Sequence, residues 1–232
     1  MMTLRNVLSL TALGAVVVLP LPVTAADSSA TPTQPLKPFA EVAMSRAQKI
    51  VDALALADGT LAAQVRSAVA EHYEKLHALH EARDKEIAGM RSDAALDAAA
   101  KTAATDRIRR ETEIGVRDLH YAFFAELSVM LLPEQVEKVK DGLTYGVLPL
   151  TYRVYCEMLP SLTAEQKSQI LAWLTEAREH AVDGGSSEEK HGWFGKYKGR
   201  INNYLAKAGY DMKKAEHELQ EKHKAARNAP AP

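Results

Sequence analysis

Residues 162–181 read LTAEQKSQILAWLTEAREHA and give the clearest indication of local structure in the chain. Thr163 and Gln166 form the T-x-x-Q pattern of a capping box, in which the two side chains bond backbone groups at the start of a helix. The apolar residues that follow recur at intervals of three and four, as on one face of an α-helix. These residues are Ile170, Leu171, Leu174, Ala177 and Ala181. The segment therefore predicts an amphipathic helix that runs through Ala181.

The same periodicity extends over the N-terminal half of the chain. Apolar residues recur at three and four over residues 40–57, and a longer helix opens at Thr60. Residues 93–105 are rich in alanine, a strong helix former, but include few large side chains to bury. They predict either the exposed distal end of a helical hairpin or a partly frayed connection. A further helix then runs to Met130.

Shorter helices are expected after Met130, and Pro133 suits the first turn of one of them. The expected segments are helices over 134–140, 150–158, 164–181, from near Trp193 to Gly209, and over 212–224, with a loop at 183–187. No segment shows a convincing strand pattern. The sequence thus predicts an all-α protein, a helical bundle with a long N-terminal helical hairpin and a C-terminal helical subdomain.

The N-terminus has the pattern of a secretory signal peptide. Arg5 precedes an apolar run over residues 7–21, and the small residues Ala25 and Ala26 end the segment. The apolar run is shorter than the roughly 20 residues that a membrane-spanning helix needs. We therefore expect cleavage after Ala25 or Ala26 and a periplasmic or secreted protein without a stable membrane anchor.

The composition predicts one globular domain. Of the 232 residues, 47% are hydrophobic and 25% are charged, so the chain is long and apolar enough to bury a core. Residues 1–26 are the expected signal peptide and 39–224 the domain, while the proline-containing segments 27–38 and 225–232 are expected to be disordered. Cys156 is the only cysteine, so no internal disulfide can form, and a small apolar role in the core is expected for it.

A basic and aromatic segment contrasts with the nearly neutral chain. The formal net charge of the whole sequence is −1, yet residues 190–214 contain seven Lys or Arg and one acid, Asp211. Such an excess of one sign points to an anionic or polyhydroxylated partner. Because a secreted protein seldom meets nucleic acid, we expect a carbohydrate partner, with an acidic glycan as the anionic candidate.

On a helix, the side chains of this segment divide between two faces. Phe194, Tyr197 and Ile201 share a face that is expected to pack in the core. The other face is cationic and carries amides, and it is either an ordinary solvated surface or a ligand site. A carbohydrate site needs a flat aromatic ring and planar donors for hydroxyls or a carboxylate. The residues that offer these groups are Trp193, Lys196, Tyr197, Arg200, Asn202 and Asn203.

Three glycines in the same segment, Gly192, Gly195 and Gly199, add little bulk to the helix. They permit either close approach of a ligand or tight packing of helices. Helix packing is the favoured interpretation.

A second candidate ligand site lies around turns set by Gly146 and Pro149. Tyr145, Tyr152, Arg153 and Tyr155 are close together in the sequence here, and loops held by a rigid scaffold are frequent binding sites. In the alternative, the rings of Tyr145 and Tyr152 fill core space and leave their hydroxyls at its rim.

One group of residues has the spacing of a zinc site. His77, His80 and Asp84 follow one another at three and four residues, so all three can face one metal ion. The surrounding residues are charged, however, and no H-E-x-x-H motif is present. We therefore expect neither a metal nor another cofactor.

Enzymatic alternatives centre on His180 and His191, which flank the loop at residues 183–187. A paired-carboxylate hydrolase is one alternative. The carboxylates near this loop in the sequence are Glu176, Glu179, Asp183, Glu188 and Glu189. The other is a lyase in which Tyr152 or His191 removes a proton and Arg153 neutralises a uronate. Because carboxylates on a charged helix normally face solvent, non-catalytic binding remains the leading expectation.

Three strings resemble a family of secreted bacterial proteins of unknown function. They are LPEQVEKVKDGLTYGVLPLTY at residues 132–152, LTAEQKSQILAWLTEAREHA at 162–181 and GSSEEKHGWFGKYKGRINNYL at 185–205. The resemblance implies a helical secreted domain that binds sugar and is often encoded near polysaccharide-degrading enzymes. It supplies no catalytic residues.

A weaker resemblance is to periplasmic helical chaperones that repeat an L-T-x-x-Q motif. Residues 162–166 fit this motif, whereas residues 131–135 read LLPEQ and lack the threonine. Helix starts with a capping residue or a first-turn proline are sufficient to explain both places and are the favoured interpretation. A chaperone function remains the alternative to carbohydrate binding.

Overall fold

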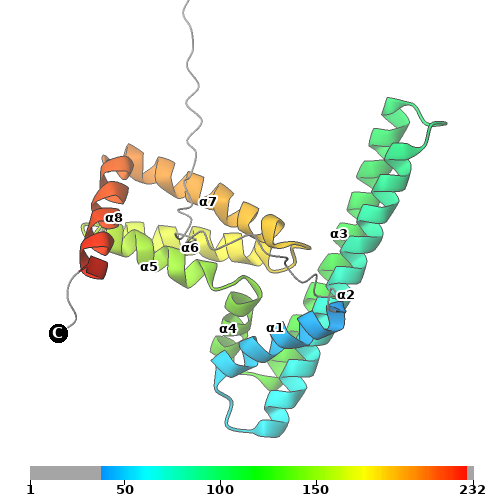
Figure 1. The fold of residues 1–232 in the computed structure, drawn as a ribbon, viewed down its shortest axis with the longest axis horizontal. Helices are drawn as coiled ribbons and strands as arrows, with labels where there is room; N and C mark the ends of the chain where they lie inside the picture. Colours follow the sequence, from blue (N-terminus) through cyan, green and yellow to red (C-terminus); the bar gives the residue numbers. More distant parts are fainter. Residues whose placement is uncertain (1–37, 229–232) are drawn as a thin grey trace, which may run out of the picture. The chain divides into compact units, whose positions relative to one another are not determined.

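A computed structural model describes residues 38–228, which form eight α-helices and no strand (Figure 1). The helices are α1 (Phe39–Leu54), α2 (Gly59–Ser92), α3 (Ala98–Met130), α4 (Pro133–Leu143), α5 (Val147–Met158), α6 (Ala164–Ala181), α7 (Ser187–Lys207) and α8 (Met212–Asn228). The predicted all-α class is therefore confirmed. The expected signal peptide and nearly all of the spacer after it lie outside the described residues. None of the eight helices is long and apolar enough to cross a membrane.

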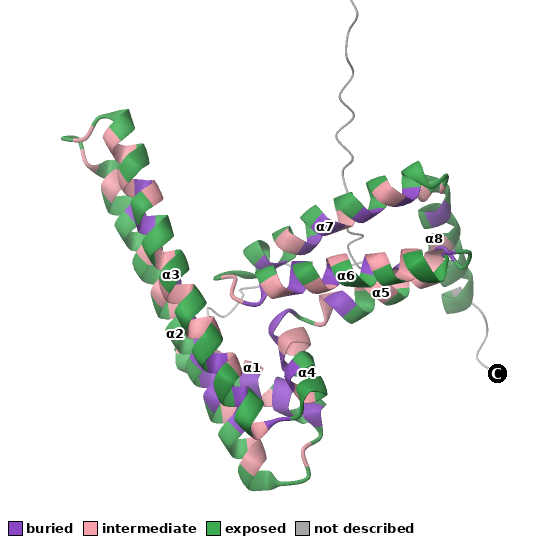
Figure 2. Ribbon diagram, turned by 180° about the vertical axis from the view of Figure 1, so that it is seen from behind, coloured by how far each residue is buried: buried purple, intermediate pink, exposed green. Residues whose placement is uncertain are grey.

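Helices α2 and α3 pair as a long hairpin (Figure 1). Each begins at an aspartate: the Asp58 carboxylate accepts hydrogen bonds from the backbone N–H groups of Thr60 and Leu61, and Asp97 caps α3 in the same way. No residue from 88 to 104 is buried, and this end of the hairpin is mostly green in Figure 2. The alanine-rich segment is thus the exposed distal end of the hairpin.

A first core forms where α1 and α4 pack against the lower part of the hairpin. Its fully buried side chains include Val65 and Val69 of α2, Leu127 of α3 and Val139 of α4. Helices α1 and α4 come very close, because a Cβ atom at Gly142 would lie 2.7 Å from Cγ1 of Ile50. Residue 142 must therefore be glycine for this contact to form.

A second core joins α5, α6, α7 and α8. Ile170, Leu174 and Ala177 of α6 pack with Phe194 and other residues of α7, as the two apolar periodicities predicted. Leu171 is the exception on α6, since 41% of it is exposed. The capping box is also confirmed: the Thr163 hydroxyl accepts from the Gln166 backbone N–H, and the Gln166 side chain accepts from the Thr163 backbone N–H.

Several helix ends differ from the prediction. Helix α1 ends at Leu54 rather than at residue 57, and α4 runs to Leu143 rather than to residue 140. Helix α7 begins at Ser187 rather than near Trp193, because the Ser186 hydroxyl accepts a hydrogen bond from the Glu189 N–H and caps the helix. Helix α5 starts earlier than expected, at Val147, and α8 continues to Asn228 instead of ending at residue 224. The earlier start of α7 leaves only a short turn between α6 and α7, and this turn forms part of the candidate site.

Candidate functional site

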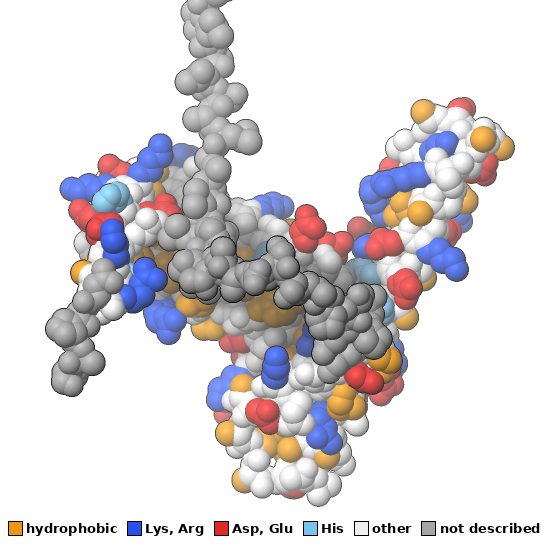
Figure 3. All heavy atoms as spheres, in the orientation of Figure 1, with side chains coloured by type: hydrophobic (Ala, Val, Ile, Leu, Met, Phe, Trp, Pro, Cys, Tyr) orange, Lys and Arg blue, Asp and Glu red, His pale blue; other side chains and the backbone are white. Residues whose placement is uncertain are grey.

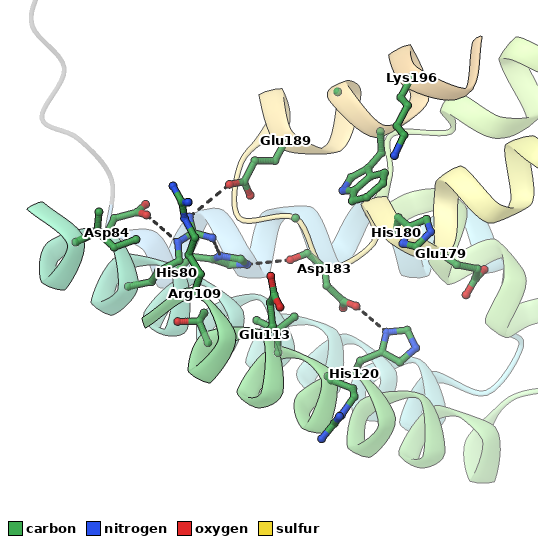
Figure 4. Close-up of a pocket in the computed structure, with 18 of the residues that line it drawn as sticks. His80, Asp84, Arg109, Glu113, His120, Glu179, His180, Asp183, Glu189 and Lys196 are labelled. Atoms are coloured by element: carbon green, nitrogen blue, oxygen red, sulfur yellow. Dashed lines mark hydrogen bonds and ion pairs between the residues drawn. The ribbon is translucent and has the colours of Figure 1, made fainter. Parts of the chain in front are cut away.

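A cleft of about 1180 Å³ lies between the hairpin and the turn that joins α6 to α7 (Figure 4). We call it the hairpin cleft. Helix α2 lines it from His80 to Arg91, α3 from Arg109 to Tyr121, and the α6–α7 region from Glu179 to Lys196. Acidic and basic groups are balanced in its lining, and both kinds also alternate over the hairpin surface in Figure 3. The cleft therefore has no large net charge, and the arrangement of its individual side chains decides what it can bind.

A histidine and an aspartate form the best-defined polar pair of the cleft. Nδ1 of His120 on α3 lies 2.8 Å from Oδ2 of Asp183 in the α6–α7 turn, and the two side chains are 21% and 17% exposed. Because the carboxylate accepts the Nδ1–H proton, Nε2 is the nitrogen of His120 left for a ligand. An imidazole oriented by a carboxylate is the arrangement of a general base.

The backbone at Asp183 is fixed by His80. Nε2 of His80 lies 2.9 Å from the Asp183 carbonyl oxygen, and its Nδ1 lies 2.9 Å from a guanidinium nitrogen of Arg83. Since a guanidinium can only donate, Nδ1 is the acceptor and Nε2 carries the proton that it donates to the carbonyl. Gly185 packs on the same ring, where a Cβ atom would lie 2.5 Å from Cγ. Glycine at position 185 thus allows the turn to come close enough to α2 for the bond between His80 and the Asp183 carbonyl.

Two buried cations fasten the end of α6 to α4. The Lys190 ammonium is 4% exposed and donates to the carbonyl oxygens of Leu143 and Val182 at 2.9 and 3.0 Å. Burial lowers the pKa of Lys190 to about 8. The Arg178 guanidinium is likewise buried and pairs with Glu137 and Asp141 of α4. These bonds hold the α6–α7 turn, and with it Asp183, in one position.

A second histidine lies beneath Asp183. His72 of α2 is 2% exposed, stacks on Phe123 at a ring separation of 3.9 Å, and places Nε2 3.9 Å from Oδ1 of Asp183. Burial lowers the pKa of His72 to about 4, so this ring is neutral at pH 7. Asp183 is therefore flanked by one imidazole that lines the cleft and one that is sealed below it.

An aromatic platform closes the α7 side of the cleft. The ring of Trp193 stacks on His180 of α6 at a centroid distance of 4.4 Å, and the Lys196 ammonium lies 5.1 Å from the Trp193 centroid. Trp193 is half-buried, while Lys196 and His180 are exposed. His180 and Lys196 thus hold the indole ring in place, and both are exposed enough to contact a ligand.

A second, shallower depression of about 600 Å³ continues along α7, and we call it the α7 groove. Its lining residues are Trp173, Lys196, Gly199, Arg200, Asn203, Tyr204 and Lys207. The Arg200 guanidinium lies 4.6 Å from the Trp173 centroid, which repeats the cation-over-indole contact of the cleft. Lys196 lines both the α7 groove and the hairpin cleft, so the two form one connected surface.

Gly192 and Gly199 of α7 face this surface rather than another helix. A Cβ atom at Gly192, Gly195 or Gly199 would meet no atom within 4 Å, so the favoured packing interpretation is wrong. Gly192 lines the hairpin cleft and Gly199 the α7 groove, whereas Gly195 lines neither. Glycine inside a helix costs about 0.5–1 kcal/mol relative to alanine. At positions 192 and 199 the absence of a side chain leaves the helix surface open to close approach by a ligand.

The structure brings together only some of the predicted ligand residues. Lys196 lies on both parts of the surface, Trp193 lines the cleft, and Arg200 and Asn203 line the groove. Tyr197 is 5% exposed and belongs to the second core. Asn202 lies on a different side of α7, where it accepts a hydrogen bond of 2.6 Å from the Tyr155 hydroxyl.

The second predicted cluster does not converge on one pocket. Tyr145 lines a depression of about 460 Å³ between α1 and α4, stacks on His191 at 5.7 Å and has a left-handed φ of 60°. Tyr152 packs against the second core, and Arg153 is exposed on α5 without lining that depression. The helical start at Val147 is the reason, since it spreads residues 147–158 around a helix instead of gathering them at a turn.

The zinc-like spacing on α2 does not produce a shared site. His77 stacks on Phe39, His80 bonds the Asp183 carbonyl, and Asp84 pairs with Arg83 at 2.8 Å. Within residues 38–228 no group of three His, Cys, Asp or Glu side chains is arranged to hold a metal ion. Cys156 is half-buried, on α5.

Several residues of the surface were not singled out from the sequence, and they include His120, Arg117 and Trp173. His120 pairs with a carboxylate 63 positions away, and no local pattern reveals such a pair. Trp173 lies in the segment that predicted α6 but was not assigned to its apolar face. Its half-buried ring contacts Arg200 of α7, and this contact depends on how α6 and α7 pack together.

These features define an all-helical protein with a polar, histidine-lined cleft beside a helical hairpin. Residues 40–225 match a family described as "Protein of unknown function (DUF3826)". The chain belongs to this family, which is of unknown function as the resemblance predicted. The match includes the N-terminal helices, which the three resembling strings did not cover. No curated protein matches the chain.

Proposed function

We propose that this protein binds an acidic carbohydrate chain along the connected surface of the α7 groove and the hairpin cleft. The observation that carries the proposal is the repeated contact of a cation with an indole: Lys196 on Trp193 and Arg200 on Trp173. Indole rings stack on the apolar faces of sugars, and the adjacent cations suit carboxylates or hydroxyls. The surface thus offers, at two places, an indole ring for stacking on a sugar and a cation for its carboxylate or hydroxyls.

The length of the surface favours a chain over a single sugar. From Trp193 to Lys207, α7 presents side chains at intervals of three and four over 14 residues, or about 21 Å of helix axis. Trp173 and His180 are two turns apart on α6. His180 contacts Trp193 at one end of this face, and Trp173 contacts Arg200 further along it. A ligand with several linked sugars can therefore contact both tryptophans.

The cations can turn to a ligand at low cost. Cation–π contacts at exposed positions are worth about 0.5–1 kcal/mol. Arg200 is more than half exposed, and its only ion pair within the described residues is a 3.7 Å contact with the exposed Glu176. A planar guanidinium forms two parallel hydrogen bonds with a carboxylate, which makes a uronate the best-matched acidic sugar.

The proposal also includes where the protein acts. The N-terminal pattern suits export through a cleaved signal peptide, which would put the protein where extracellular polysaccharides are met. The resemblance to proteins encoded near polysaccharide-degrading enzymes supports the same class of ligand. The chaperone alternative gains no support, since Thr163 and Gln166 are fully used as the capping box of α6.

Titration calorimetry with uronate polymers and with neutral glycans tests the proposal. We expect uronate binding that weakens as salt is added, because exposed charges are screened. Trp173→Ala, Trp193→Ala and Arg200→Ala should each lower affinity at least about tenfold, which corresponds to 1.4 kcal/mol. Lys214→Ala removes the same charge from α8, outside the surface, and serves as the matched control. Affinity unchanged by all three surface variants would refute the proposal.

A further inference from the structure

We propose that the hairpin cleft is catalytic, with His120 as the base of a β-elimination that cleaves the bound chain at a uronate. This inference rests on the proposed function, because it requires an acidic carbohydrate in the cleft. It goes beyond binding in assigning a reaction to His120, a positioning role to Asp183 and a substrate-binding role to Arg117.

The geometry of His120 is that of an oriented base. Asp183 accepts from Nδ1 at 2.8 Å, so Nε2 is the basic nitrogen, and the ring lines the cleft (Figure 4). Asp183 in turn is held by backbone bonds from His80 and Lys190 to its own and the preceding carbonyl. A base that is fixed through two layers of contacts has the preorganisation that proton abstraction requires.

Asp183 also has the surroundings needed to stabilise a protonated His120. Its Oδ1 is buried and makes no hydrogen bond, and the His72 ring beneath it has no hydrogen-bond partner on either nitrogen. Of the two carboxylate oxygens, only Oδ2 therefore has a hydrogen-bond partner, which is His120. When His120 takes up a proton, the resulting imidazolium forms an ion pair with Asp183 in a partly desolvated place.

The carboxylates of the cleft do not suit a paired-carboxylate hydrolase. Such an enzyme needs one carboxylate free to act as acid and another free as base or nucleophile. Asp84 pairs with Arg83, Glu179 with Lys140, Asp183 with His120, and Glu189 accepts the Gly185 N–H at 2.7 Å. Of the cleft carboxylates, Glu113 alone has neither an ion pair nor a hydrogen bond within residues 38–228. One available carboxylate together with an oriented histidine favours elimination.

Arg117 is placed to neutralise the substrate carboxylate. It lies three residues before His120, on the same side of α3, and also lines the cleft. Its 3.3 Å contact with Asp118 joins two side chains that are 60% and 66% exposed, so the pair is weak and readily exchanged. A guanidinium on the uronate carboxylate makes the neighbouring C5–H more acidic, because it stabilises the negative charge that forms there.

The reaction is balanced without a co-reactant. Nε2 of His120 takes the proton from C5 of the uronate, the electron pair becomes the C4=C5 double bond, and the bond between C4 and the bridging oxygen breaks. The proton then passes from Nε2 to the leaving oxygen, which departs as an alcohol. His120 returns to its neutral form, and the products are a shortened chain and a chain that begins with an unsaturated uronate.

The test measures binding and cleavage separately on the same polymers. The full protein is mixed with polygalacturonate, polymannuronate and a 4-linked glucuronan, and the unsaturated product is followed by its ultraviolet absorbance and by mass spectrometry. We expect product from at least one polymer. His120→Gln, which keeps an amide within reach of Asp183, should lower the rate by about 10²–10⁴-fold while calorimetric affinity changes less than about threefold.

Two further variants separate positioning from structure. Asp183→Asn should lower the rate and displace the pH profile of the reaction, an effect that a merely structural residue does not produce. Arg117→Ala should raise the KM for the polymer and lower kcat, whereas Arg110→Ala, an exposed arginine of α3 outside the cleft, should change neither. His217→Gln on α8 is the matched control for His120.

Each outcome decides between the two proposals. Polymer binding without unsaturated product from any of the three polymers overturns the elimination and leaves the binding function intact. Product formation that survives His120→Gln overturns the assignment of the base. Absence of any polymer binding overturns the binding function, and the elimination falls with it.

Discussion

Nε2 of His72 lies 3.9 Å from Oδ1 of Asp183, and both atoms are buried without a hydrogen bond. This distance is too long for a hydrogen bond. Buried polar atoms without partners reduce stability by about 1–3 kcal/mol each, so the protein maintains an unfavourable arrangement directly beneath the His120–Asp183 pair. Such local cost is typical of functional sites.

His72 should make the protein less stable in mild acid. Its pKa is about 4 in the folded protein, below the usual 6.5, because burial disfavours the charged ring; Asp183 opposes the shift, and Lys190, His120 and Lys75 add to it. Between these pH values the unfolded chain binds more protons than the folded protein, so stability falls as the pH decreases through this range. From pH 7 to pH 5 the loss through His72 is about 2 kcal/mol.

Urea unfolding of His72→Phe at both pH values checks this expectation. The variant keeps an aromatic ring on Phe123 but has no titrating nitrogen, and it should be more stable than wild type, with the larger gain at pH 5. His77→Phe is the matched control on the same helix, because His77 also stacks on a phenylalanine but is 41% exposed. An equal gain at both pH values for His72→Phe would contradict the assignment.

Lys190→Met should destabilise the fold despite removing a buried charge. The ammonium is the hydrogen-bond donor to the carbonyl oxygens of Leu143 and Val182, which methionine cannot replace. Leaving two buried acceptors without a donor costs on the order of 1–3 kcal/mol, partly offset because burial of the charged ammonium is itself unfavourable. Chemical denaturation measures the difference. Lys198→Met, a half-buried lysine of the same helix, should cost less than about 1 kcal/mol.

The helices could be predicted from the sequence because their signals are local. The capping box at Thr163 and the apolar periodicities both act within one or two turns. The predicted start of α7, in contrast, was wrong. Helix α7 was expected to start near Trp193, yet the Ser186 cap and the buried Lys190 hold its first two turns in place.

The candidate site was only partly predictable, because it depends on which helices meet. Trp193, Lys196, Arg200 and Asn203 were found from composition and spacing on one helix. His120 is brought to the site by α3, and its role depends on Asp183 in a turn that Lys190 and His80 hold in place. Pairing over such separations leaves no trace in the periodicity of a single sequence.

Gly185→Ala should disturb the His120–Asp183 pair without direct contact with it. The added methyl carbon would lie 2.5 Å from the His80 ring, and that ring cannot move without breaking its bond to the Asp183 carbonyl. We expect a loss of about 1–3 kcal/mol in stability and a change in the NMR chemical shifts of the His120 ring. Gly195→Ala meets no atom within 4 Å and should instead stabilise α7 by about 0.5–1 kcal/mol. Similar effects of the two variants would argue against a steric role for Gly185.

Gly199→Leu should separate the ligand role of α7 from its stability. A side chain at position 199 projects into open space and replaces a helix-destabilising residue, so the variant should unfold at the same denaturant concentration as wild type or a higher one. It would also fill part of the α7 groove between Trp173 and Lys196, and the affinity for an acidic oligosaccharide should fall at least about tenfold, or 1.4 kcal/mol. Gly195→Leu makes the same change on the same helix outside the groove and the cleft, and it should leave affinity within about twofold of wild type, less than 0.5 kcal/mol. Calorimetric titration of both variants, with unfolding curves recorded on the same samples, gives the comparison. Equal affinities for the two would mean that the open strip of α7 is not where the carbohydrate lies.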